Sequence, residues 1–196
     1  MKPGWTKSWL CISALFLAQS AIAAIAASIP AKDTRANELT IAGFRPGRDK
    51  LAAARAKIGN KLPTTEDEPD RVITWHEFCN GQDLRIEADK NGLIQSLDLS
   101  TIEPVHRCSQ EALAAAQQTG YWRTGRGLIL GDSRRRVISL YGPPGSNGPS
   151  QQGDERRELL YYAFDWAGSD VPQVMEVSCD KASGRVVEIM LAFPSL

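Results

Sequence analysis

The chain has 196 residues, equal numbers of acidic and basic side chains, and 42% hydrophobic residues. This length suits one medium domain or two small ones. The balanced charge argues against a nucleic-acid partner held by phosphate neutralisation, because such proteins need a basic excess.

Residues 1–27 have the features of an export signal. Lys2 and Lys7 precede an apolar run that ends in small residues with two Ala-Ile-Ala sites, which favours cleavage over an uncleaved signal anchor. Cys11 lies inside the apolar run and not at a cleavage point, so we expect no lipid anchor. Removing two Lys and no acid leaves 21 basic and 23 acidic residues, a net charge of −2. The expected location is periplasmic or extracellular.

Two stretches share one pattern of helix signals. They are "GRDKLAAARAKIGNKLP", from residue 47, and "GDSRRRVISLYGPP", from residue 131. Each has a glycine, a cap-type residue, a helical segment, a second glycine and a proline. We expect Asp49 to cap the first helix and Asp132 or Ser133 to cap the second. Gly59 and Gly142 are expected to end the two helices.

Strand patterns follow both helices, with dense β-branched and aromatic residues or with alternating apolar positions. These segments are 71–78, 83–100, 158–166 and 174–192. Lys90-Asn91-Gly92 and Ala182-Ser183-Gly184 supply residues typical of tight hairpin turns.

The elements predict an α+β fold of two tandem repeats, each a short helical segment packed on a three- to four-stranded antiparallel sheet. The first repeat spans 40–103 and the second 124–196. A flexible segment is expected at 28–39, and a linker with a short helix at 104–123. Each helix would cover one face of its sheet and leave the other face solvated.

The order of glycine, cap, short helix, "YG-P", aromatic strand and a hairpin with Asp before its turn resembles the SmpA/OmlA (BamE-like) envelope lipoprotein domain. Residues 40–100 and 125–193 carry the resemblance. A tandem pair of such units is similar to β-lactamase inhibitor proteins, which form one concave surface from two helix–sheet repeats. The resemblance implies a non-enzymatic protein that binds another protein. This chain lacks the family's lipid-attachment cysteine, so membrane anchoring is not carried over.

Three cysteines lie beyond the export signal. We expect Cys79 to pair with Cys108, because a strand-like segment ends near each and an exported chain permits disulfides. Cys179 lies in an alternating run and is expected to be a buried thiol. An alternative zinc set joins the two paired cysteines to His76 and His106, but its spacing is not that of a zinc ribbon. We therefore expect no metal and no cofactor.

The motif Gly131-Asp132-Ser133 follows an apolar run, as the nucleophile does in GDSL-type hydrolases. Such a serine needs a histidine base near the C-terminus, but His76 and His106 are the only histidines and both lie upstream. A helix cap explains the same residues. We expect no enzyme, and the alternative is a secreted hydrolase, zinc-dependent or serine-type.

Two polar loops are candidate rims of a binding surface. Residues 142–157 are rich in Gly and Pro and predict a mobile connection. Residues 166–173 join two strands and carry Trp166 and Asp170. An exposed Trp at a rim suits a contact with a partner, whereas a Trp that folds back on its sheet is the alternative.

Arginines gather before and within the second helix. Arg123 and Arg126, with residues 134–136, either form an anion site at a helix start or are a solvated helix face. The expected function is protein–protein binding, as scaffold or inhibitor, through an open sheet face and its loops. The residues assigned to that binding are Trp166, Asp170, Arg123 and Arg126.

Overall fold

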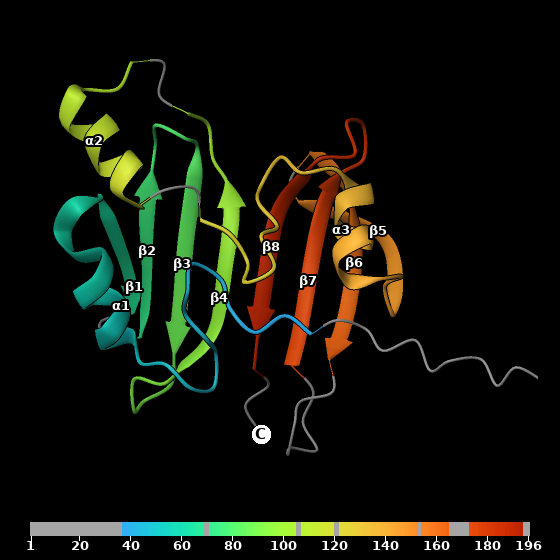
Figure 1. Ribbon diagram of the computed structural model, residues 1–196, viewed down its shortest axis with the longest axis horizontal. Coiled ribbons are helices and arrows are strands. Elements are labelled where there is room, and N and C mark those ends of the chain that lie inside the picture. Colours follow the sequence, from blue (N-terminus) through green and yellow to red (C-terminus); the bar gives the residue numbers. More distant parts are fainter. Residues whose placement is uncertain are drawn as a thin grey trace, which may run out of the picture. The chain divides into compact units, whose positions relative to one another are not determined.

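In the computed structural model, strands dominate the part of the chain that is described. The described residues are 37–68, 71–104, 107–119, 122–152, 154–164 and 173–193. They form one antiparallel sheet of eight strands with helices on one side (Figure 1). The predicted export signal, most of the 28–39 segment, His106 and residues 166–172 lie outside the described residues.

The strands follow the order β1-β2-β3-β4-β8-β7-β6-β5 across the sheet. Their bounds are β1 Thr64–Glu68, β2 Val72–Glu77, β3 Gln82–Ala88, β4 Ile94–Thr101, β5 Ser146–Gln152, β6 Glu155–Phe164, β7 Gln173–Asp180 and β8 Val186–Ala192. The helices are α1 (Leu51–Ile58), which continues into a 3-10 turn η1 (Gly59–Lys61), α2 (Gln110–Thr119) and α3 (Arg134–Tyr141). Within the described ranges, no helix is both long enough and apolar enough to cross a membrane.

The predicted fold class is wrong in its main feature, because the chain does not form two repeats with separate sheets. Strands β4 and β8 pair with each other, from Ser96 opposite Ala192 to Ser100 opposite Glu188. An unpaired strand edge would leave backbone N–H and C=O groups without partners. Pairing satisfies both edges and merges all eight strands into a single sheet.

The two outer strands are also absent from the sequence prediction. The predicted mobile connection at 142–157 contains β5, and no strand is predicted where β1 lies. All of β1 and most of β5 are exposed, so neither strand shows the apolar alternation of a half-buried strand. Glu66, Asp67 and Glu68 on β1 and Pro149 on β5 are typical of free edges.

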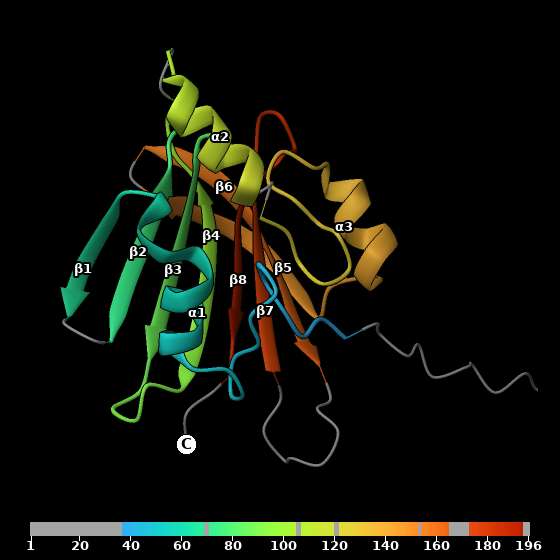
Figure 2. The same ribbon diagram turned by 60° about the vertical axis from the view of Figure 1, so that its left-hand side comes forward.

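One face of the sheet forms the core together with the helices. Cross-strand register aligns two buried rows on this face: Trp75, Leu84, Leu99, Ile189, Val177 and Leu160, then Ile73, Ile86, Leu97, Leu191, Met175 and Tyr162. Helices α1 and α3 lie on this same side (Figure 2) and add Leu51, Ala54, Val137 and Tyr141. Among the described residues the core begins at Ile41, so a chain that starts at Ser28 keeps every core residue that the structure describes.

The helix ends match the sequence prediction in α3 and only partly in α1. Ser133 Oγ accepts the Arg136 N–H at 3.3 Å, and Gly142 ends α3 with a φ of 77°. Gly59 ends α1 with a φ of 63°. The predicted Asp49 cap is wrong, because the Asp49 carboxylate accepts the Arg45 N–H instead. Lys50 occupies the N-cap position of α1 and makes no side-chain hydrogen bond there.

A buried carboxylate ties the first described residues to the loop before α3. Glu38 Oε1 accepts the N–H groups of Leu39, Thr40 and Gly125. Its Oε2 accepts the Arg126 N–H at 2.9 Å and the Tyr141 hydroxyl at 2.8 Å. Five donors thus satisfy Glu38, which leaves it no role in contacts outside the chain.

Candidate binding face

The side of the sheet opposite α1 and α3 carries every second residue of its strands, most of them partly exposed and Ser178 buried. None of the described helices packs on it (Figures 1 and 2), and we call it the open face. By cross-strand register its members include Thr74, His76, Asp83, Arg85, Glu87, Ser96, Asp98, Ser100, Glu188, Met190, Glu176, Ser178, Arg157, Leu159 and Tyr161.

Carboxylates outnumber cations on the open face. The acidic residues are Asp83, Glu87, Asp98, Glu155, Glu176 and Glu188, whereas Arg85 and Arg157 are the arginines. Fixed charges of one sign create a potential that attracts groups of the opposite sign and repels like-charged ones. This face therefore favours a partner that carries Lys or Arg.

Arg157 is neutralised within this face. Its guanidinium contacts Glu188 at 2.9 Å and Glu155 at 2.8 Å, and its side chain is only 11% exposed. Beside it the sheet is hollowed by about 230 Å³. The hollow is lined by Ser150, Gln151, Gln152, Arg157, Leu159, Glu176, Ser178, Glu188 and Met190.

Asp98 occupies the centre of the open face, between Arg85 on β3 and Met190 on β8. Its Oδ1 is buried and has no hydrogen-bond partner within the described part of the chain. Burial raises the pKa of this carboxyl to about 7, with a further contribution from Glu188, although Arg85 opposes the shift. Near neutral pH this group is therefore close to half-protonated.

A hydrogen-bonded chain crosses three strands at the other side of the open face. Thr65 Oγ lies 2.8 Å from His76 Nε2, and His76 Nδ1 lies 2.9 Å from Asp83 Oδ1. Because an ionised carboxylate only accepts hydrogen bonds, Nδ1 is the donor, and in the neutral ring Nε2 accepts the threonine hydroxyl. Phe78 stacks on His76 with ring centroids 5.5 Å apart and is 39% exposed.

The structure describes two of the four predicted binding residues, and neither of these two lies on the open face. Arg123 and Arg126 are exposed, but they lie in the loop before α3, on the helix side of the sheet. Trp166 and Asp170 lie outside the described residues.

Ser133 is a helix cap, as predicted. Its hydroxyl accepts a backbone N–H of α3, whereas His76 lies on the open face and is bonded to Thr65 and Asp83. His76 is therefore not the base of a serine nucleophile at Ser133, and His106 lies outside the described residues.

The predicted disulfide between Cys79 and Cys108 is confirmed, with the two Cα atoms 5.9 Å apart. It joins the β2–β3 turn to the segment before α2 and takes both thiolates away from the alternative zinc set. Within the described ranges, no group of three or more His, Cys, Asp or Glu residues could hold a metal ion. Cys179 is buried, as predicted, and burial raises the pKa of its thiol to about 11.

The sequence prediction did not select Asp98, Glu176 or Glu188. A usable signal was present, because Asp98 alternates with Leu97 and Leu99, whose side chains point into the core. That alternation places Asp98 on the opposite face. The contact between Thr65 and His76 gave no such signal, since β1 has no apolar alternation.

No model of a known protein family matches the chain, and no curated protein is significantly similar to it in sequence. The chain is similar in structure to a DUF4309 family protein, YjgB, from Bacillus subtilis subsp. subtilis str. 168. The two are 11% identical, the match covers 78% of this chain and 83% of the other, and the TM-score is 0.44. The likeness carries no functional argument, and the SmpA/OmlA resemblance stays a prediction from sequence.

Proposed function

We propose that this chain is exported to the cell envelope and binds a protein partner on the open face, as a scaffold or an inhibitor, without catalysing a reaction. The observation that carries the proposal is the open face itself, which spans the sheet and which the described helices leave uncovered. The features of residues 1–27 that are typical of an export signal support the location.

The chemistry of the open face defines the partner. Glu176 lines the hollow, Glu188 and Glu155 neutralise Arg157, and Asp98 has a buried oxygen without a hydrogen-bond partner. A basic side chain that enters this area would gain charge-assisted hydrogen bonds. Phe78 adds an exposed aromatic contact of the kind that dominates interface energies. The proposed partner therefore presents Lys or Arg to the area of Glu176 and Asp98 and a separate apolar group to Phe78.

Affinity capture with paired variants tests this proposal. The chain from Ser28 is immobilised and exposed to an extract of its own envelope. The open-face variant combines Phe78→Ala with Glu176→Gln. The matched control combines Leu113→Ala with Glu111→Gln, which changes the same kinds of group on α2, where Leu113 is 46% exposed.

We expect a protein that the native chain and the α2 variant capture and that the open-face variant loses by about tenfold or more, as for an exposed aromatic contact residue. Equal capture by all three chains would place the contact elsewhere and overturn the proposal. Thermal unfolding of each variant shows whether its fold is intact.

The hydrogen-bonded chain Thr65–His76–Asp83 favours a second candidate, a secreted hydrolase. A hydroxyl bonded to a histidine that a carboxylate orients is the arrangement of an activated nucleophile. In this mechanism Thr65 Oγ attacks the carbonyl carbon of an ester, and His76 Nε2 takes the hydroxyl proton. His76 then gives that proton to the departing alkoxide. Water cleaves the acyl–threonine ester by the same proton transfers.

A fluorophosphonate probe separates the two candidates. If the chain is a hydrolase, the probe labels Thr65, and the label is lost in Thr65→Val and His76→Gln but kept in Ser133→Ala. Labelling is located by peptide mass spectrometry. A chain that is not labelled at Thr65, while its 4-nitrophenyl acetate hydrolysis is unchanged by Thr65→Val, is not this hydrolase.

A further inference from the structure

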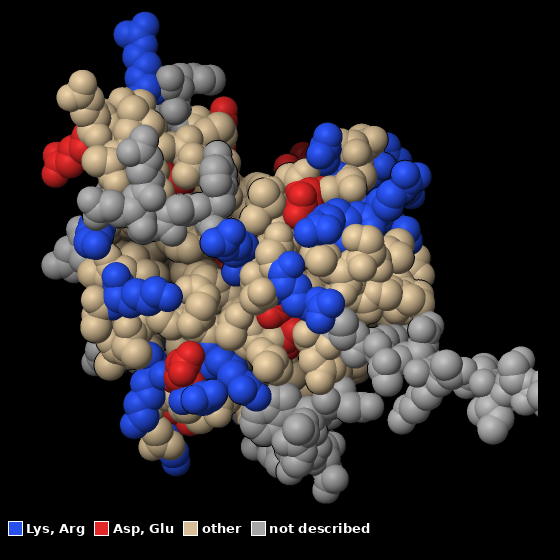
Figure 3. Space-filling model, in the orientation of Figure 1, with Lys and Arg blue, Asp and Glu red and all other residues tan. Residues whose placement is uncertain are grey.

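The helix side of the molecule is covered with basic side chains. Figure 3 shows Lys and Arg gathered on this side, with fewer Asp and Glu. We define the basic face by Lys57, Arg123, Arg126, Arg135, Arg136 and Arg185, all of which are exposed. They come from α1, from the loop before α3, from α3 and from the residue before β8.

Several carboxylates on the helix side are engaged within the chain. Glu38 accepts five hydrogen bonds, as described above, and Asp132 accepts the Ile129 N–H. Two others are paired with arginines, Glu66 with Arg55 and Glu158 with Arg134. The charges of Arg123, Arg135 and Arg136 are therefore not offset by these carboxylates.

The molecule is consequently polarised, although its formal net charge is zero. The open face carries the acidic excess described above, and the helix side carries the cations. Net charge alone therefore does not exclude an anionic partner, because a local basic face attracts anions independently of the total.

We propose that the basic face binds the surface of an anionic lipid membrane. The cations are spread over several elements and do not converge on one pocket, which fits a plane of many headgroup charges. Single-stranded nucleic acid, in contrast, needs exposed aromatic rings for stacking. The large aromatic residues Trp122 and Tyr141 on this side are buried.

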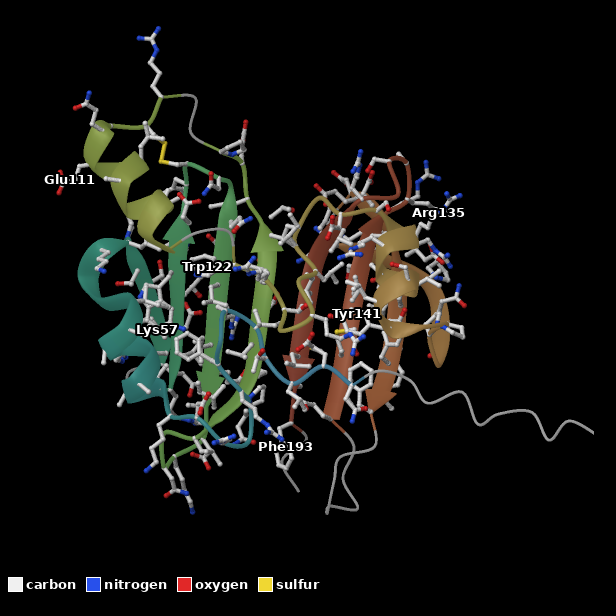
Figure 4. The ribbon with its side chains drawn as sticks, viewed as in Figure 1. Lys57, Glu111, Trp122, Arg135, Tyr141 and Phe193 are labelled. Carbon is white, nitrogen blue, oxygen red and sulfur yellow. A yellow bond between two sulfur atoms is a disulfide. The ribbon has the colours of Figure 1, made fainter. Side chains whose placement is uncertain are left out.

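The directions of individual side chains support a docked orientation in which the helix side of the sheet faces the membrane. In Figure 4, Arg135 lies near the start of α3 and extends into solvent. Tyr141, the last residue of α3, points back over the sheet. The guanidinium of Arg126 lies over the Tyr141 ring, 5.9 Å from its centroid, and remains exposed. Docked in this way, the protein would direct its open face away from the lipid.

Vesicle sedimentation tests the inference, which shares only the export step with the proposed function. The probe is the chain from Ser28, which avoids the apolar export signal and keeps every described core residue. It is mixed with vesicles of phosphatidylcholine alone or with phosphatidylglycerol added. We expect binding only to the anionic vesicles, and loss of that binding in about 0.5 M salt, where charges are screened within a few ångströms.

Charge-removing pairs locate the contact. Arg135→Gln with Arg136→Gln, and Arg123→Gln with Arg126→Gln, should each weaken binding by about 25-fold, since each of the two cations removed contributes about fivefold near an anionic surface. The control Arg85→Gln removes an exposed cation on the open face, on the other side of the sheet from the basic face. It should bind as the native chain does. Arg135→Lys with Arg136→Lys should also keep binding, because it preserves the charge.

Equal binding to neutral vesicles, an equal loss in the Arg85→Gln control, or no binding to anionic vesicles would each overturn the inference. Preferential binding to nucleic acid over anionic vesicles would also overturn it. The capture experiment on the open face is independent of these results, because its variants leave the basic face unchanged.

Discussion

The two halves of the sheet use the same backbone hydrogen bonds at equivalent places. In the first half (α1 and β1–β4), the Leu51 N–H donates to Gly92 O at 2.9 Å. In the second half (α3 and β5–β8), the Arg134 N–H donates to Gly184 O at 2.9 Å. In both halves the first helical residue is thus tied to the glycine of the neighbouring hairpin.

The side chains that reinforce this shared backbone are different. The second half has the Ser133 cap and a two-point contact of Arg134 with Glu158, which lowers the pKa of that carboxyl. The first half has no side-chain cap on α1 but carries the disulfide. The same backbone arrangement is therefore stabilised by different side-chain interactions in the two halves.

The largest expected effect comes from breaking the junction between the halves. Leu99 on β4 faces Ile189 on β8, and both are fully buried. Leu99→Ala and Ile189→Ala should each lower the free energy of unfolding by about 2–5 kcal/mol, through lost burial and the cavity left behind. Urea unfolding measures these values.

The cost of the double variant should differ from the sum of the two single costs, because neighbouring cavities interact. Ile73→Ala and Leu160→Ala, on the separate strands β2 and β6, are the matched pair and should be additive. Two separate unfolding transitions in the native chain would contradict a continuous core.

The disulfide is a further difference between the halves, because the described residues of the second half contain no disulfide. Cys79→Ser with Cys108→Ser should lower the free energy of unfolding by about 3–4 kcal/mol, since the bond closes a long loop of the unfolded chain. In the chain from Ser28, a thiol assay under denaturing conditions should count one reactive group, Cys179. A count of three would refute the pairing.

Asp98 predicts a pH dependence at the boundary between the halves. Below about pH 4 the carboxyl is protonated in both the folded and the unfolded chain. Between pH 4 and 7 the unfolded chain loses the proton first, so wild-type stability falls as pH rises. Asp98→Asn should therefore match wild type near pH 4 and exceed it by about 1–3 kcal/mol at pH 8.

Asp180, in the second half, serves as a control in which the pKa of the carboxyl is shifted in the opposite direction. Hydrogen bonds from Ser183 lower the pKa of Asp180. Asp180→Asn should therefore reduce stability at neutral pH, and the difference should vanish in strong acid. An Asp98→Asn variant that is less stable than wild type at pH 8 would refute the assignment of a raised pKa.

The smallest expected effect compares the two helix starts. Ser133→Ala removes the bond to the Arg136 N–H and should cost about 1 kcal/mol. Lys50→Ala occupies the equivalent position on α1, where there is no side-chain cap, and should change stability by less than about 0.5 kcal/mol. Thermal melts measure both, and equal losses would show that the cap is not the source of the difference.

The sequence predicted the helices and strands in which some side chains face the core and the others face solvent in a regular pattern. Strands β2, β3, β4, β7 and β8 alternate clearly, and both helices end at the predicted glycines. Strands β1 and β5 have no buried face, so their composition resembles that of a loop. The pairing of β4 with β8 left no sequence signal, because each strand alternates in the same way at an edge or in the middle of a sheet.

The residues of the candidate surfaces also divide into those that the sequence could place and those that it could not. Asp98 could have been assigned to the open face from its place between two leucines. Four of the six cations of the basic face belong to the arginine cluster that the sequence shows before and within the second helix, whereas Lys57 and Arg185 come from distant segments and join them only in the fold.

The two free borders of the sheet limit how the protein can grow by self-association. An extended chain from a second molecule could add to β1 only against its row of Glu66, Asp67 and Glu68. At the other border, Pro149 offers no amide hydrogen to an incoming strand. Both borders of this wide sheet therefore disfavour the addition of strands from other molecules.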